Sequence, residues 1–181
     1  PTGDKADILL RKVFFIIYET MDILITDMKR SSFDHLGVMK DLMQRCDRFC
    51  NFYCRTLWKN KKLNPFAWTM VQQLLLTQHS FFYCYKALSE NKYKNFSSSI
   101  FLYLHDVKKM FRIIEQMYYK KELNDLTLAT KLKDNLLFSQ TTQLQKTKVG
   151  IFLSPFLFDM AKTMFSVISP ILGLNMEENK N

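Results

Sequence analysis

Glycine and proline are scarce in this sequence, with four residues of each among 181. β-Sandwiches and β-barrels need turn residues about every ten positions, so the scarcity excludes both architectures. Long helices joined by few loops need far fewer of these residues. The composition therefore predicts an all-α fold, and the length is normal for one domain with one hydrophobic core.

Motifs of the common enzyme classes are also missing. The chain has no Gly-rich phosphate loop, no dinucleotide-binding fingerprint and no G-x-S-x-G elbow. His35, His79 and His105 are scattered, and none lies in a recognisable motif with a nucleophile. We therefore expect a binding protein with no catalytic residues and no cofactor, rather than an enzyme.

A secretory signal is not recognisable either. The apolar run from Ile8 to Met28 is interrupted by charged residues such as Arg11 and Glu19. Because those charges are costly inside a bilayer, we do not expect this run to span a membrane. We expect a cytoplasmic protein with free thiols in a reducing compartment.

Three of the four cysteines, Cys46, Cys50 and Cys54, are spaced four residues apart on one predicted helix. This spacing places them on the same side of the helix, which suits either a set of metal ligands or a row of buried thiols. Structural zinc sites prefer short spacers in loops and usually a second pair of ligands. The pattern therefore favours buried thiols, and we expect no metal.

Helical periodicity predicts six helices, joined mostly by short loops into one antiparallel bundle. Their approximate bounds are Asp4–Lys29, Phe33–Asn60, Pro65–Glu90, Ser99–Lys121, a helix capped by Asn124-Asp125 that ends near Phe138, and Gly150–Ser169. Ser31 and Ser32 are predicted to separate the first helix from the second and to cap the second helix. A polar loop is expected at 140–148, and Pro155 is expected to kink the last helix or delay its start. The domain is predicted to cover 1–174, with a fraying polar tail at 175–181.

The chain is rich in large apolar residues, with 16 Phe and 10 Met. These residues give the predicted helices wide apolar faces. Such faces suit either a tightly packed core or a cavity that binds a hydrophobic ligand, and both interpretations stay open. If a cavity is present, we expect these residues to line it: Phe14, Ile17, Met43, Phe49, Tyr53, Leu74, Phe81, Phe111, Ile114, Phe156 and Met160.

The charge balance is basic, with 26 Lys and Arg against 17 Asp and Glu and a formal net charge of +9. Four basic residues of the second predicted helix fall within about 80° of one another, opposite its apolar face. They are Arg45, Arg48, Arg55 and Lys59, and Lys61 and Lys62 extend the charge into the following loop. This stripe is either a solvated surface or an anion-binding rim.

The segment 56–64 reads Thr-Leu-Trp-Lys-Asn-Lys-Lys-Leu-Asn. It resembles the junction between the second and third helices of the TIPE family (tumour necrosis factor alpha-induced protein 8-like). Residues 14–28, 38–43, 102–121 and 156–172 are similar to other helical segments of that family. The family's junction Arg corresponds to Lys59, and an Arg early in its third helix corresponds to Gln72.

The resemblance implies a six-helix cylinder around a large hydrophobic cavity, which takes acyl chains while basic residues at its mouth meet phosphates. It also implies a non-enzymatic, phosphoinositide-binding regulator of survival and inflammatory signalling. We therefore expect a lipid-binding regulator of this type or a lipid transfer protein. On this basis we expect the headgroup to contact Lys59, Lys61, Lys62 and Arg55. Arg45 and Arg48 are expected to face an anionic membrane, with which the protein would associate peripherally.

Two other functions remain as alternatives. The first is a helical adaptor in apoptosis or immune regulation that binds signalling proteins and no lipid. The second is a nucleic-acid binder, which we do not expect because the sequence has no helix-turn-helix signature and its aromatic residues lie mainly on core faces. The expected partners are therefore a phosphoinositide or another phospholipid, an anionic membrane surface, and signalling proteins.

Overall fold

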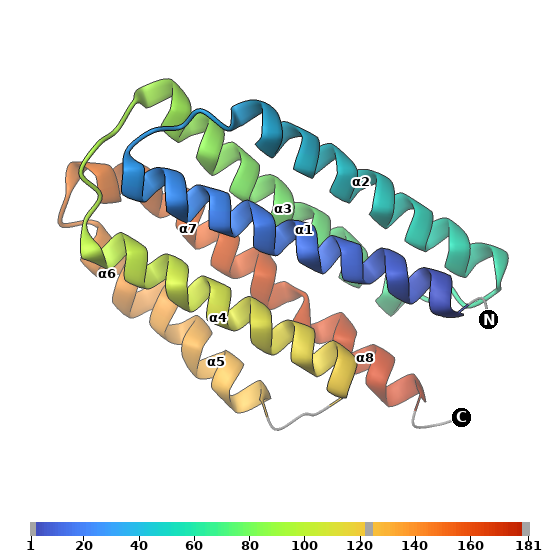
Figure 1. The fold of residues 1–181 in the computed structure, drawn as a ribbon. Helices are drawn as coiled ribbons and strands as arrows, with labels where there is room; N and C mark the ends of the chain where they lie inside the picture. Colours follow the sequence, from blue (N-terminus) through green and yellow to red (C-terminus); the bar gives the residue numbers. More distant parts are fainter. Residues whose placement is uncertain (1–2, 122–124, 179–181) are drawn as a thin grey trace.

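The computed structural model describes residues 3–121 and 125–178, and within them the protein is all-α, with six packed helical rods and no β-strand (Figure 1). This arrangement confirms the predicted fold class. The first four rods are α1 (Gly3–Arg30), α2 (Leu36–Lys59), α3 (Pro65–Asn91) and α4 (Ser98–Lys120). The fifth runs without interruption through α5 (Leu126–Asp134), the π-helical η1 (Asn135–Gln140) and α6 (Thr141–Leu144). The sixth consists of α7 (Lys148–Ser166) followed by α8 (Ile168–Glu178).

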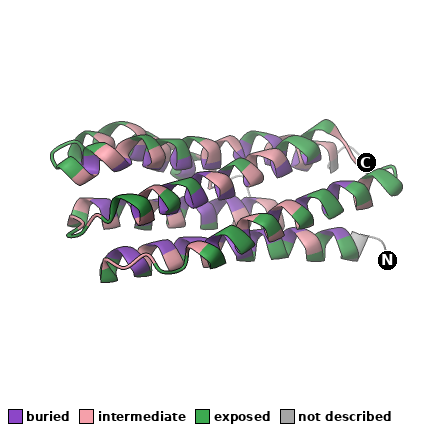
Figure 2. Ribbon diagram, turned by 90° about the horizontal axis from the view of Figure 1, so that it is seen from above, coloured by how far each residue is buried: buried purple, intermediate pink, exposed green. Residues whose placement is uncertain are grey.

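Four rods form the centre of the bundle. Helix α1 packs against α3, α3 against α7, α7 against α4, and α4 against α1. Helix α2 covers α1 and α3 from outside, whereas α5 covers α4 and α7. Figure 2 shows the consequence, with buried residues facing between the rods and exposed residues on their outer sides.

The break between α1 and α2 differs from the prediction. Ser31 has a φ of 53°, and the backbone N–H groups of Ser31 and Ser32 donate to carbonyls in the last turn of α1. The two serines therefore close α1 and do not cap α2. Helix α2 starts later than predicted, after His35, whose backbone N–H donates to the Tyr85 hydroxyl at 2.9 Å. A contact from a distant helix thus sets this boundary.

The predicted loop at 140–148 is wrong for most of its length. The fifth rod stays helical to Leu144, and a short turn then leads into α7. At this turn the side chain of Thr147 accepts a hydrogen bond from the Gly150 N–H at 3.0 Å. A Cβ on Gly150 would lie 1.9 Å from the Leu144 carbonyl oxygen, so only glycine fits.

Pro155 lies inside α7 and does not delay the start of that helix. Proline has no N–H, so it cannot bond the carbonyl four residues earlier, that of Ile151. The Ser154 hydroxyl donates to this carbonyl at 3.0 Å instead. The Ser154 hydroxyl thereby gives the Ile151 carbonyl a hydrogen-bond donor in place of the N–H that Pro155 lacks.

The last rod also extends further than predicted. Asn175, assigned from the sequence to a polar tail, is buried in α8, and its side chain donates to the Met117 carbonyl at 3.4 Å. Residues 179–181 of that tail, and the predicted cap residue Asn124, lie outside the described residues.

One described helical stretch, Lys148–Glu177, is long and apolar enough to cross a membrane by length and composition alone. Core helices of soluble proteins meet the same two criteria, and this stretch packs against α3 and α4. From the sequence, only the apolar run at 8–28 was considered as a possible membrane span, and this second stretch was overlooked.

Candidate functional site

The turn between α2 and α3 is fixed by backbone hydrogen bonds. The Lys62 N–H donates to the Leu57 carbonyl at 2.9 Å, and the Lys61 N–H donates to the Trp58 carbonyl at 3.0 Å. These bonds form a Schellman motif, in which the residue at the position of Lys61 adopts a left-handed conformation and is usually glycine. Lys61 occupies it with a φ of 55°. Lys61 therefore has a backbone conformation that is unfavourable for a residue with a side chain, and it places a positive charge at the turn.

Helix α3 starts immediately after this turn. The Asn64 side chain accepts a hydrogen bond from the Ala67 N–H at 2.7 Å, and Pro65 occupies the first helical turn. The position of Pro65 matches the sequence prediction for this helix start, whereas the cap by Asn64 was not predicted. The turn that carries the lysines is therefore held at both of its ends.

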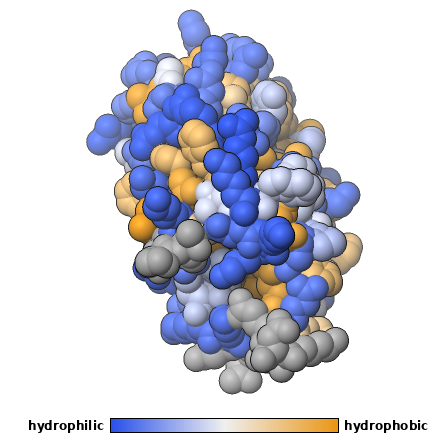
Figure 3. Space-filling view, turned by 90° about the vertical axis from the view of Figure 1, so that its right-hand side faces the viewer, coloured by the Kyte–Doolittle hydropathy of each residue, from blue (hydrophilic) through white to orange (hydrophobic). Residues whose placement is uncertain are grey.

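The tip hollow is a surface depression of about 470 Å³ lined by Trp58, Lys59, Lys61 and Leu63. Trp58 is 74% exposed, more than any other large hydrophobic residue in the described chain. Phe66 and Trp68, in the first turn of α3 that follows the α2–α3 turn in the chain, are also exposed. Figure 3 looks onto this end of the bundle, where hydrophobic residues show between hydrophilic ones. The tip thus combines aromatic rings with lysine ammonium groups.

The end pocket lies beside the tip hollow and has a volume of about 580 Å³. Five helix ends meet there: the amino ends of α1 and α3 and the carboxyl ends of α2, α4 and α8. Its lining residues are Ala6, Asp7, Tyr53, Leu57, Lys62, Asn64, Ala67, Tyr118, Tyr119, Lys121, Leu174, Asn175 and Glu177. Charges of both signs, amides and tyrosine rings therefore share one cavity.

Burial and neighbouring charges raise the pKa values of two tyrosines that line the end pocket, Tyr53 and Tyr119. Burial raises the pKa of Tyr53 well above its ordinary value, and its contact with Tyr118 and the negative charge of Asp7 add to the effect. Burial, the Tyr118 hydroxyl and Asp7 also raise the pKa of Tyr119, against the opposing charge of Arg11. Asp7 therefore lies close enough to both rings to influence them.

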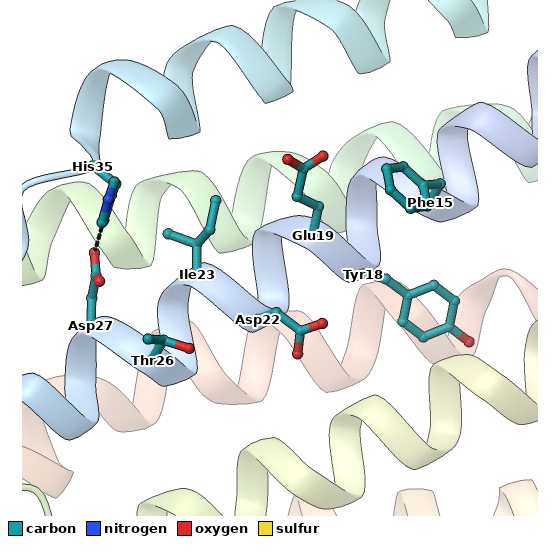
Figure 4. Close-up of a pocket in the computed structure, with 8 residues that line it drawn as sticks. All are labelled: Phe15, Tyr18, Glu19, Asp22, Ile23, Thr26, Asp27 and His35. Carbon is teal, nitrogen blue, oxygen red and sulfur yellow. Dashed lines mark hydrogen bonds and ion pairs between the residues drawn. The ribbon is translucent and has the colours of Figure 1, made fainter.

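The α1 groove is a third hollow, of about 400 Å³, on the outer face of α1. Figure 4 shows that its residues follow α1 between α2 and α4, with His35 at one end. Asp27 is only 2% exposed, and it lies 2.8 Å from Nδ1 of His35 and accepts a hydrogen bond from the Tyr85 hydroxyl. These contacts join α1, α2 and α3 through one buried carboxylate.

The chemistry open to this groove is limited. An Asp–His pair can orient a histidine for proton transfer or for metal binding. However, no group of three potential metal ligands occurs among the described residues. The hydrogen bonds of the described residues also join no serine, threonine or cysteine to the His35 ring. The contacts that the structure does show for this cluster connect α1, α2 and α3.

The residues predicted to contact a headgroup lie on the last turns of α2 and in the α2–α3 turn, but they do not form one site. Lys59 and Lys61 line the tip hollow, whereas Lys62 lines the end pocket. Arg55 is exposed on α2 and lines none of the three hollows. Arg48 is exposed, and Arg45 lies 3.8 Å from Asp41 on the same helix.

The residues expected to line a central cavity are distributed through the interior. Seven of them are buried in the core: Phe14, Ile17, Leu74, Phe81, Phe111, Ile114 and Met160. Met43, Phe49 and Phe156 are partly buried against that core. Phe14 and Phe111 pack against each other in a tilted arrangement, with ring centroids 5.3 Å apart. Only Tyr53 lines one of the three hollows described above.

All four cysteines are buried with free thiols, as the interpretation of core-filling thiols predicts. Burial raises the pKa of the Cys84 thiol to about 12. The neighbouring Cys46 and burial raise the pKa of Cys50 far above its ordinary value. Thiols held protonated in this way are poor nucleophiles and poor metal ligands at neutral pH.

Comparison of this chain with protein-family models, with curated proteins and with solved structures found no match. The TIPE-family resemblance therefore rests on the segments that carry it, and what it implies stays a prediction.

Sequence reasoning missed the Asp27–His35 pair, although the pattern contains a signal for it. Leu10, Val13, Ile17 and Leu24 form the buried stripe of α1, and Asp27 follows Leu24 by three residues on the same face. A carboxylate on an apolar stripe indicates a buried polar contact. The end pocket had no such signal, because it forms only when five distant helix ends come together.

Proposed function

We propose that this protein is a non-enzymatic, peripheral binder of anionic phospholipids, phosphoinositides included, which attaches through the tip between α2 and α3. The carrying observation is the tip hollow, which the highly exposed Trp58 lines together with Lys59 and Lys61. Tryptophan favours the membrane–water interface, where its ring reaches the lipid and its N–H stays hydrated. Lysines beside it would meet lipid phosphates.

The surroundings of the tip support the same proposal. Both tryptophans of the chain are exposed, Trp58 at the tip and Trp68 in the first turn of α3, where Phe66 is exposed as well. An exposed apolar group costs free energy in water and gains it in the interface. Each lysine near an anionic surface contributes about 1 kcal/mol. Aromatic and basic groups together thus supply the two contributions that peripheral attachment requires.

Vesicle co-sedimentation tests the proposal with a double variant, Lys59→Ala with Lys61→Gly. Glycine adopts the left-handed conformation of residue 61 freely, so this variant loses charge without straining the turn. Two lysines at about 1 kcal/mol each predict that affinity for anionic vesicles falls on the order of 30-fold.

The matched control is Lys146→Ala with Lys148→Ala, which removes the same charge at the opposite end of the bundle, from the turn before α7 and from the first residue of that helix (Figure 1). Its affinity is expected to stay close to that of the unaltered protein. Equal losses in the two variants would mean that binding is a general effect of the net positive charge. Absence of binding to anionic vesicles would overturn the proposal and leave the adaptor function.

Native mass spectrometry of the purified protein distinguishes two forms of the proposal. A retained lipid would indicate that acyl chains enter the helical interior, as the TIPE-family resemblance implies. Vesicle binding without retained lipid would indicate attachment at the surface through the tip alone.

A further inference from the structure

The end pocket contains charged, amide and tyrosine side chains that attachment of the tip to a membrane does not require. The two hollows share the α2–α3 turn, since Lys61 lines the tip hollow and Lys62 the end pocket. A protein attached through the tip would therefore hold the end pocket next to the layer of lipid headgroups. The following inference rests on the proposed function and concerns which headgroup enters this pocket.

Two opposite charges in the end pocket are open to a ligand. Asp7 and Lys62 are both exposed, and no ion pair joins either of them to another described residue. Asn64, in contrast, already donates to Glu177 at 2.6 Å. A purely anionic ligand would be attracted by Lys62 and repelled by Asp7. A ligand with both charges would satisfy both side chains.

The backbone at the end pocket has the same mixed character. The carboxyl ends of α2, α4 and α8 present partial negative charge, whereas the amino ends of α1 and α3 present partial positive charge. Carbonyl oxygens at the carboxyl ends, like the Asp7 carboxylate, accept hydrogen bonds. The cationic part of a ligand should therefore carry N–H donors, which a primary ammonium has and a quaternary choline lacks.

Tyrosine rings provide the third element. Tyr53 and Tyr118 line the pocket, and Asp7 is close enough to Tyr53 to raise its pKa. An ammonium group near aromatic faces is attracted by the negative potential of the ring electrons. The chain already uses this interaction here, because Arg11 lies 5.0 Å from the Tyr119 ring centroid.

We propose that the end pocket binds the headgroup of an aminophospholipid, with its primary ammonium beside Asp7 and the tyrosine rings and its phosphate beside Lys62. Phosphatidylserine fits best, because it joins a primary ammonium to the net negative charge that the tip attracts. Phosphatidylglycerol and phosphatidylinositol have similar net charge but no ammonium, so they lack the group that Asp7 recognises.

The test compares vesicles of phosphatidylcholine that contain equal mole fractions of phosphatidylserine, phosphatidylglycerol or phosphatidylinositol. The full chain is expected to bind phosphatidylserine vesicles on the order of tenfold more tightly than the other two, which corresponds to about 1.4 kcal/mol. Asp7→Asn should remove this preference, while binding to phosphatidylglycerol stays or increases because a negative charge is lost. Asp7 is exposed, so the fold should tolerate the change.

Asp41→Asn is the matched control, because Asp41 is an exposed carboxylate in the first turns of α2, outside the end pocket. This variant should keep the preference for phosphatidylserine. Equal binding of the unaltered protein to phosphatidylserine and phosphatidylglycerol would overturn the inference and leave the proposed function intact. So would a preference for phosphatidylinositol, or a preference for phosphatidylserine that survives Asp7→Asn. Absence of binding to all three vesicles would overturn both.

Soluble glycerophosphoserine identifies the source of the headgroup. Calorimetric binding to the protein without vesicles, lost in Asp7→Asn, would support the pocket and show that the free headgroup suffices. A vesicle preference without soluble binding would support the pocket with the membrane-bound lipid as its ligand. Glycerophosphoglycerol is the negative control in both cases, and binding as tight as that of glycerophosphoserine would count against the pocket.

Discussion

The free energy of unfolding is expected to fall steeply as the pH rises above about 9. Several buried groups hold their protons more tightly in the folded protein than in the unfolded chain. Burial raises the pKa of Cys84 from 9.0 to about 12. It also raises the pKa values of Tyr53 and Tyr103 well above their ordinary value of 10.0.

The sign of this effect follows from the protons bound in each state. Below pH 9 both states keep these protons, so the stabilising contribution is fully present. Above pH 9 to 10 the unfolded chain releases protons that the folded protein retains, which favours unfolding. Each group then costs about 1.4 kcal/mol per pH unit, so several groups cost several kcal/mol between pH 10 and 12.

Urea denaturation at a series of pH values measures this loss. Tyr103→Phe is the informative variant, because removal of one such group should reduce the slope above pH 10 by about 1.4 kcal/mol per pH unit. Tyrosinate absorbance from the buried rings should appear together with the loss of helical circular dichroism. Ionisation of these rings in a fully helical protein would contradict the prediction.

Tyr85→Phe is expected to cost about 2–3 kcal/mol of stability. The Tyr85 hydroxyl donates to the buried Asp27 carboxylate and accepts the His35 backbone N–H at 2.9 Å. Its removal deprives a buried carboxylate of one donor and leaves that N–H without its partner. At this chain length the loss corresponds to a Tm lower by about 5–10 °C.

Tyr83→Phe is the matched control, since Tyr83 lies on the same helix but is 53% exposed. Its stability should change by less than about 0.5 kcal/mol. Hydrogen exchange adds a local readout, because the amide of His35 should lose protection in Tyr85→Phe. Equal stability of the two variants would show that the Asp27 cluster does not connect the helices as the structure indicates.

Periodicity predicted the six rods because each has an apolar stripe that must face other helices. It failed where a distant contact decides the outcome. Helix α2 starts after His35 because Tyr85 accepts the His35 N–H, and this tyrosine lies 50 residues away. The fifth rod continues through Gln140, which is buried and donates to Asp106 on α4 at 2.6 Å. A polar sequence there suggested a loop, but the Gln140 amide N–H has an acceptor on a neighbouring helix, and the hydroxyls of the two threonines that follow it donate to carbonyls within the rod itself.

The candidate site was predictable only in part. Lys59 and Lys61 were identified because they continue a basic stripe into a loop, and local sequence controls both features. Asp7 and Tyr119 could not be associated with them, because only packing brings the start of α1 and the end of α4 to the α2–α3 turn. Charge runs are thus visible in a sequence, whereas a pocket built from helix ends is not.

Tryptophan fluorescence of Trp68→Phe tests the central claim most directly, because this variant leaves Trp58 as the only tryptophan. On addition of anionic vesicles, Trp58 emission should shift to shorter wavelength, and brominated acyl chains should quench it. Trp58→Phe serves as the complementary variant, with Trp68 as the reporter. Vesicle binding with unchanged Trp58 emission, or no binding at all, would contradict attachment through the tip.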